Sequence, residues 1–140
     1  MPNGALIEAY RTTRFVAYDG QHEITVRIDE RSPEVDALLD RYGARSGSFI
    51  TAWNPRSKPQ SRAMNDAAAK RLAAVVAAAG YPALPHKGIS ADGAWFEEGL
   101  FAIGIPVDRA IAIAAEFRQN AITVIDRGSV GRLVFTPLFA

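Results

Sequence analysis

Apolar and polar residues recur along the chain with different spacings, and each spacing predicts a type of element. Strict alternation over Glu23–Ile28 is typical of a strand with one buried face. Ser48–Trp53 and Gly99–Ile105 are mostly apolar without strict alternation, which favours strands covered on both faces. Across 61–79, apolar residues three and four positions apart indicate an amphipathic helix, the longest in the chain.

Turn-forming and capping residues set the ends of the predicted elements. Asp19-Gly20 is typical of a hairpin turn, Ser32-Pro33 of a helix start and Gly43 of a helix end. Asn120 suits the left-handed position after the last helix. Residues 81–94 contain three turn formers, so we expect an irregular loop there.

Helices and strands alternate, with a hairpin at each end of the chain. The elements are a helix at 4–11 capped by Asn3, strands at 14–18 and 23–28, a helix between Pro33 and Gly43, a strand at 48–53, a helix at 61–79, a strand at 99–105, a helix from Pro106 to Phe117, and strands at 121–125 and 132–136. The order αββαβαβαββ predicts an α/β (α+β-like) fold, a single mixed β-sheet flanked by helices. Residues 1–140 carry no repeat or long linker and are expected to form one globular domain.

Three of these helices are expected to cover the sheet with an apolar face. Their buried positions are Val35, Leu38, Leu39 and Tyr42 in the first, Met64, Ala68, Leu72, Val75, Val76 and Ala79 in the second, and Val107, Ala110, Ile111, Ala114 and Phe117 in the third.

Composition and charge narrow the class of protein. Apolar residues make up 49% and charged residues 22%, which indicates a soluble globular domain. Lysine and arginine number 16 against 15 acidic residues, and the resulting charge of +1 argues against nucleic-acid or membrane-surface binding. A start without a secretory signal, and no apolar run long enough to span a bilayer, predict a cytoplasmic protein.

Cysteine and histidine counts limit the chemistry. The absence of cysteine excludes disulfides, thiolate nucleophiles and sulfur-ligated zinc. His22 and His86 are too few for a histidine-based metal cluster, and neither has an acid or nucleophile at catalytic spacing. We therefore expect two structural histidines, no metal and no cofactor, and the sequence names no catalytic residue.

The segment Phe49–Asn65 carries the strongest functional pattern. A buried strand leads into a polar loop with Asn54, Arg56 and Ser57, and the loop leads into a helix that begins at Ser61. Backbone N–H groups and the positive dipole end at a helix start favour an anion, which the arginine would help to neutralise. The alternative is purely structural, with Ser61 capping the helix and Asn54 holding the turn.

Three other parts of the sequence contain residues that could contact a ligand. Trp53 is expected in the core with its indole N–H bonded to a backbone carbonyl, and the alternative is a stacking platform for a ring. Glu97 and Glu98 precede a strand, where neighbours point to opposite faces, so at most one serves a given site; the alternative is an exposed acidic strand entry. Gln119-Asn120 is a capping device first and a ligand contact second.

The candidate ligand-binding residues come from strand ends that are far apart in the sequence. They are Trp53, Asn54, Arg56, Ser57, Ser61, Asn65, Glu97, Glu98, Gln119 and Asn120. Asn54 follows its strand, whereas the other polar pairs precede theirs. The set can therefore meet only if the strand at 48–53 runs antiparallel to those at 99–105 and 121–125.

Several motifs resemble an uncharacterised bacterial family, domain of unknown function 3293. They are Tyr10-x-x-Thr13-x-Phe15, FITAWNP-x-S with Ser61 and Asn65 following, Asp92-Gly93-x-Trp95, the Glu97/Glu98 strand entry, and the closing FRQNAITVID. These motifs lie in order over nearly the whole chain. The resemblance implies no catalytic residues, because the family has no assigned activity.

Two classes of function remain after this reading. The first is a small protein that binds an anionic, phosphate- or nucleotide-like molecule at residues 49–65, whether or not it is an enzyme. The second is a non-enzymatic interaction module, an adaptor or immunity-type partner, with an apolar patch from Trp95, Phe96 and Leu138-Phe139.

Overall fold

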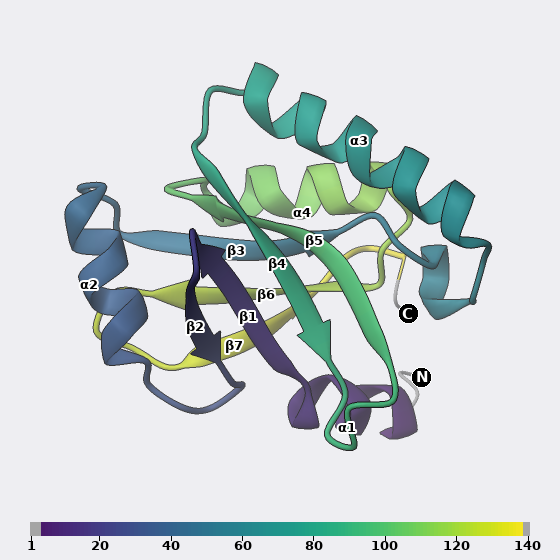
Figure 1. Cartoon of the computed structure of the whole chain (residues 1–140), viewed down its shortest axis with the longest axis horizontal. Helices are drawn as coiled ribbons and strands as arrows, with labels where there is room; N and C mark the ends of the chain where they lie inside the picture. The colour runs from purple at the N-terminus through teal and green to yellow at the C-terminus, as the bar shows by residue number, and fades with distance from the viewer. Residues whose placement is uncertain (1–3, 139–140) are drawn as a thin grey trace.

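The computed structural model describes residues 4–138, in which seven strands and four α-helices form one sheet with helices around it (Figure 1). The elements are α1 (Gly4–Thr12), β1 (Arg14–Asp19), β2 (His22–Val26), α2 (Pro33–Arg41), β3 (Ser46–Thr51), the short 3₁₀ helix η1 (Pro55–Ser57), α3 (Arg62–Ala78), β4 (Ala83–Ile89), β5 (Phe96–Ile103), α4 (Val107–Glu116), β6 (Ala121–Asp126) and β7 (Gly131–Phe135). The expected cap Asn3 and the expected patch residue Phe139 lie outside the described residues.

The strand order is β2-β1-β4-β5-β3-β6-β7. This confirms the predicted fold class, a single sheet flanked by helices, with two differences in detail. Every pair of named strands is antiparallel, where a mixed sheet was expected. The described residues also contain one strand more than the predicted order, because β4 was not expected.

The prediction of an irregular loop over 81–94 is wrong for half of that segment, because Ala83–Ile89 form β4. β4 lies inside the sheet, between β1 and β5. Proline has no backbone N–H to donate, so it is tolerated where a strand has a neighbour on one side only. Pro85 is such a position, because β4 pairs with β5 there, whereas its pairing with β1 begins at His86. Residues 90–95 form a turn, as expected, and it joins β4 to β5.

One face of the sheet, the α3/α4 face, is covered by the two longest helices, which lie above the strands in Figure 1. Leu72 and Val76 of α3 and Ile113 of α4 pack with Ile50 and Ile122 of the sheet in one buried cluster. The apolar spacing predicted that Leu72 and Val76 face the core, but it did not predict Ile113. The α3/α4 face is therefore a closed core.

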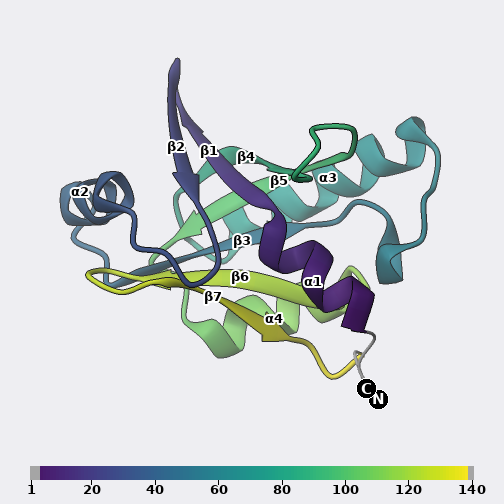
Figure 2. The ribbon, with the colours of Figure 1, turned by 90° about the horizontal axis from the view of Figure 1, so that it is seen from below.

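The opposite face, the pocket face, is covered by two separate short helices. α2 packs Val35, Leu38 and Leu39 against strand residues such as Ile24 and Phe101. α1 lies in front of the other end of the strands in Figure 2, and none of its residues is buried. At one end of the pocket face, α2 packs tightly on the sheet. At the other end, α1 covers the sheet without burying any of its own residues.

The two predicted serine N-caps are confirmed, and so is Gly43 after α2, whereas the predicted end of α4 differs. The Ser32 and Ser61 hydroxyls accept the backbone N–H groups of Val35 and Met64, as expected of N-caps. The left-handed residue after α4 is Arg118, with φ of 56°, and not Asn120. The chain turns two residues earlier than predicted because the Asn120 carbonyl already accepts Thr136 N–H beside the start of β6.

Three expectations about side chains are corrected. Tyr42 is 46% exposed because it lies just past the end of α2, and Met64 is 60% exposed because the first turn of α3 buries Asn65 instead. Trp53 is buried as expected, yet its indole N–H has no hydrogen-bond partner among the described residues. Its ring lies 5.6 Å from the Phe96 ring, with the Arg62 guanidinium 4.9 Å away over its face.

Candidate functional site

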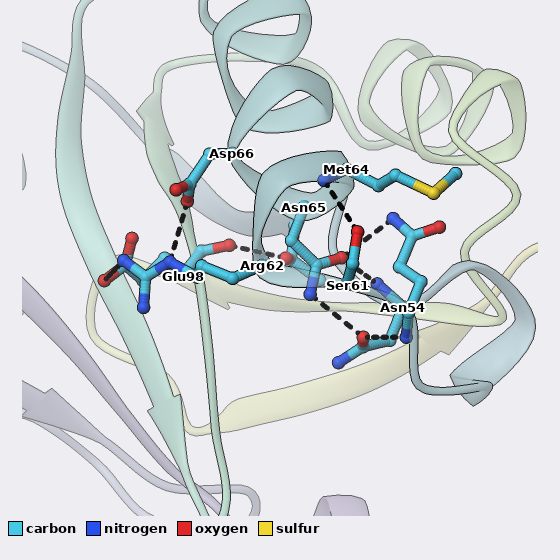
Figure 3. Close-up of polar contacts among 9 residues, drawn as sticks. Asn54, Ser61, Arg62, Met64, Asn65, Asp66 and Glu98 are labelled. Carbon is cyan, nitrogen blue, oxygen red and sulfur yellow. Dashed lines mark hydrogen bonds and ion pairs between the residues drawn. The ribbon is translucent and has the colours of Figure 1, made fainter.

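The polar loop after β3 is held by a pair of asparagines. Asn54 N–H donates to Asn65 Oδ1 at 2.9 Å, and Asn65 Nδ2 donates back to Asn54 Oδ1 at 3.1 Å (Figure 3). Gln60 adds its backbone N–H to Asn54 and its side-chain amide to Asn65. Asn54 has a left-handed backbone with φ of 48°, which asparagine accepts more readily than most residues. The loop is therefore fixed by side chains that are themselves buried.

One donor of this pair points out of the loop, toward Glu97. Asn54 Nδ2 donates to Glu97 Oε2 at 2.9 Å. Partial burial disfavours the charged form of Glu97 and raises its pKa from 4.5 to about 7, although the Asn54 hydrogen bond opposes the shift. Near neutral pH this carboxyl is therefore close to half protonated.

Glu98 points to the other face of the sheet, as alternation along a strand requires. Its carboxylate lies 3.5 Å from Arg62, which also binds Asp66 at 2.9 Å (Figure 3). Glu98 thus has a cation beside it. Glu97, by contrast, is bonded only to the Asn54 amide within residues 4–138.

A cavity of about 570 Å³ lies between α1 and the pocket face. Its wall combines apolar side chains with a few polar ones. The residues that shape it include Leu6 and Tyr10 of α1, Phe15 of β1, Phe49 and Thr51 of β3, Ser57 of η1, His86 and Gly88 of β4, Asp92 and Trp95 of the following turn, Glu97 of β5, Gln119 before β6, Thr123 of β6 and Leu133 of β7. Its size is typical of a small-molecule site.

Ser57 joins three parts of the cavity wall. Its hydroxyl lies 3.4 Å from the Tyr10 hydroxyl and accepts Asn120 Nδ2 at 3.1 Å. Burial raises the pKa of Tyr10, so its hydroxyl keeps its proton at neutral pH. Nearby, Gln119 Nε2 donates to the Trp53 carbonyl at 2.9 Å. These bonds connect α1, η1 and the start of β6.

His86 is a buried histidine at the back of this wall. Burial lowers its pKa from 6.5 to about 4, so it is neutral under ordinary conditions. Its ring packs edge-on to Phe49 at 5.1 Å. Gly99 lies directly beside it, and a Cβ there would come within 2.6 Å of His86 Cε1 and collide with the Ile50 carbonyl. The neutral ring and the glycine form one tightly packed unit.

The ten sequence candidates divide into three groups. Ser57, Glu97 and Gln119 line the cavity. Asn54, Asn65 and Asn120 hold those residues in place through the bonds above. Trp53, Arg56, Ser61 and Glu98 do not line it. The antiparallel condition for convergence is met, because β3 runs antiparallel to both β5 and β6.

Sequence reasoning missed several cavity residues, among them Tyr10, Gly88 and His86. Alternation on β4 was the signal that could have found the last two, but the segment was expected to be a loop. Tyr10 and Trp95 stood in the motifs of the family resemblance, which gave them no role. Among residues 4–138, no group of three histidine, cysteine or acidic side chains is placed to hold a metal. In the same range, no helix has both the length and the apolar character needed to cross a bilayer.

Residues 50–122 match the family model described as "Protein of unknown function (DUF3293)". The chain belongs to this family. This confirms the resemblance, although the match leaves out the Tyr10–Phe15 motif. No curated protein and no solved structure matches the chain. The family range contains one wall of the cavity, with Thr51, His86 and Glu97, while the α1 wall lies outside it.

Proposed function

We propose that this protein binds a small molecule in the cavity under α1, with the Glu97 carboxyl as the polar anchor. One observation carries the proposal: an acidic side chain with a displaced pKa lines a largely apolar cavity of suitable size. Glu97 Oε2 is bonded to Asn54, and Oε1 has no hydrogen-bond partner among the described residues. A ligand can therefore reach an oxygen that the protein leaves open.

The surroundings of Glu97 support a binding role. Its partner Asn54 is held in turn by Asn65 and Gln60, so the carboxyl is positioned before any ligand arrives. Prior positioning reduces the side-chain entropy that the protein must lose when a ligand binds. The mouth of the cavity is flanked by Trp95, which is 45% exposed.

The anionic ligand expected at residues 49–65 stays a prediction. Arg56 and Ser61 do not line the cavity, and Ser61 is occupied as the cap of α3. Bacterial origin and a cytoplasmic location also stay predictions. The second candidate function is the interaction module, which is favoured by the exposure of Trp95 and Phe96, consecutive residues where the β4–β5 turn enters β5.

A substitution that fills the cavity tests the proposal. Gly88 lines the cavity with an ordinary backbone, and a Cβ there would meet nothing nearer than Thr13 Cγ2 at 3.5 Å. A screen of aromatic fragments by ligand-observed NMR should give hits that weaken in Gly88→Ala and disappear in Gly88→Val. Thr25→Val, outside the cavity on β2, should keep every hit. Hits that survive Gly88→Val would overturn the assignment to this cavity.

A further inference from the structure

The charges around the cavity are of one sign. Among the described residues that line it, Glu97 and Asp92 are acidic and none is a lysine or arginine. Hydrogen bonds from Ala94 N–H and Ser90 lower the pKa of Asp92, so it is ionised at neutral pH. His86 is neutral and Tyr10 keeps its proton. An anion in this cavity would meet no cation and at least one negative charge.

Strand alternation explains why the basic residues are elsewhere. Arg14 precedes Phe15 on β1, and Lys87 precedes Gly88 on β4, so both point away from the cavity. Lys87 Nζ lies 5.0 Å from the Phe96 ring on that other face. Arg62, also on that face, is already paired with Glu98 and Asp66.

Glu97 is therefore a partly buried carboxyl without a cation. Its neighbour Glu98, one residue along the strand, has Arg62. Keeping an unpaired carboxylate out of water costs free energy, and a cation brought to Oε1 would offset that cost through a charge-assisted hydrogen bond. Among the described residues, no side chain provides that cation to Glu97.

The rest of the wall suits the body of an organic cation. The Phe15 and Phe49 rings pack 5.7 Å apart on the pocket face, and Tyr10 and Trp95 line the same cavity. Aromatic faces attract cations as well as apolar groups. A ligand with a positive nitrogen at one end and a flat ring at the other would use both kinds of contact.

We propose that the ligand of this cavity is an aromatic organic cation, a protonated amine or a cationic heterocycle whose N–H pairs with the Glu97 carboxylate. This inference rests on the proposed function and assigns its ligand class. The cation favours the ionised form of Glu97, so binding releases a proton wherever that carboxyl is protonated in the free protein. Of the titratable groups that face the cavity (Tyr10, His86, Asp92 and Glu97), Glu97 alone has a pKa within the range from 5.5 to 8.

Probes that share one body and differ in charge test the inference. Calorimetry would compare 2-phenylethylamine, 2-phenylethanol and phenylacetate, and the fragment screen would be sorted into the same three charge classes. We expect the amine to bind at least about tenfold more tightly than the alcohol at pH 8, and phenylacetate not to bind. From pH 8 to pH 5.5 the amine affinity should fall about 30-fold as Glu97 takes up its proton.

Two matched variants locate the effect. Glu97→Gln should remove both the preference for the amine and its pH dependence, whereas Glu98→Gln, one residue away and outside the cavity, should keep both. The inference is overturned if the hits are neutral or anionic, if the amine affinity is independent of pH, or if Glu97→Gln leaves it unchanged. Non-cationic hits that Gly88→Val abolishes would leave the proposed function standing, whereas no Gly88→Val-sensitive hit in any class would end both.

Discussion

The two faces of the sheet are built from the same strands and covered in opposite ways. On the α3/α4 face, two long helices bury a continuous apolar cluster. On the pocket face, α2 closes one end with three buried residues, and α1 spans the other end with none. Part of the pocket face therefore stays open as the cavity, and its buried polar side chains, His86 among them, gather there. In this molecule, one face is core throughout, whereas the other combines a second buried cluster under α2 with the cavity under α1.

The largest expected effect on this comparison is the loss of stability when one leucine on each face is replaced by alanine. Leu72 of α3 is fully buried, so Leu72→Ala should lower the free energy of unfolding by about 2–5 kcal/mol. Leu6 of α1 is only partly buried over the cavity, so Leu6→Ala should cost less than about 1 kcal/mol. Urea titration followed by circular dichroism measures both. Equal losses would show that α1 belongs to the core, against this comparison.

The next largest effect is the pH dependence of stability, which should come from the titratable groups of the pocket face. Glu97 has a raised pKa in the folded chain, so its contribution is fully present below pH 4.5 and is lost as pH rises through about 7. Glu97→Gln should therefore be more stable than the wild type above pH 7, by up to about 3 kcal/mol. Denaturant titrations at pH 5 and pH 8 measure the difference, and a gain of equal size at both would contradict it.

His86 gives the opposite slope in the same variant. Its pKa is lowered from 6.5 to about 4, so its contribution is present above pH 6.5 and is lost as pH falls through 4. With Glu97 replaced by glutamine, the stability of the variant should rise between pH 4 and pH 6.5. A flat profile in that window would mean that His86 is protonated as readily in the folded chain as in the unfolded one.

A smaller effect separates two glycines of the pocket face. Gly99→Ala should destabilise the fold by about 1–3 kcal/mol, because the added methyl meets the Ile50 carbonyl and His86. Gly88→Ala should change stability by less than about 0.5 kcal/mol, because its methyl enters the cavity. Thermal unfolding of the two variants side by side is the measurement. Similar losses in both would mean that position 88 is packed and not open.

The smallest effect tests the segment from which the anion hypothesis came. Ser61→Ala removes the cap of α3 and should cost about 1 kcal/mol of stability. Because Ser61 does not line the cavity, the affinity for cavity ligands should be unchanged. Calorimetry on Ser61→Ala at pH 8 checks this, with Ser61→Asp as the variant that restores the cap. A loss of ligand affinity in both variants would show that the N-terminus of α3 takes part in ligand binding.

Local patterns predicted much of the fold, because caps and apolar spacing act within a few residues. Ser32, Ser61 and Gly43 mark helix ends as expected. Apolar spacing identified Ala68, Leu72 and Val76 of α3 and Ala110 and Ala114 of α4, but it missed Ile113. β4 was missed because Pro85 and Gly88 are turn formers in isolation. Pairing with β1 and β5, which no local pattern contains, makes that segment a strand.

The site was predictable only in part, for a related reason. Asn54, Glu97 and Gln119 were grouped through an argument about strand direction, which the pairing of β3 with β5 and β6 confirms. The neutral His86 and the cover by Tyr10 depend on contacts between residues dozens of positions apart. Burial also changes the chemistry of a residue, and the raised pKa of Glu97 cannot be read from its place in the sequence.

The weak attachment of α1 has a consequence for kinetics. None of its residues is buried, and its hydroxyl contact to η1, between Tyr10 and Ser57, spans 3.4 Å. Backbone amide hydrogens of α1 should therefore exchange with deuterium quickly, through local openings. Those of α3 should exchange slowly, only when the whole domain unfolds. We therefore expect the proposed ligand to enter and leave the cavity through local openings of α1, with a residence time that does not depend on the stability of the core.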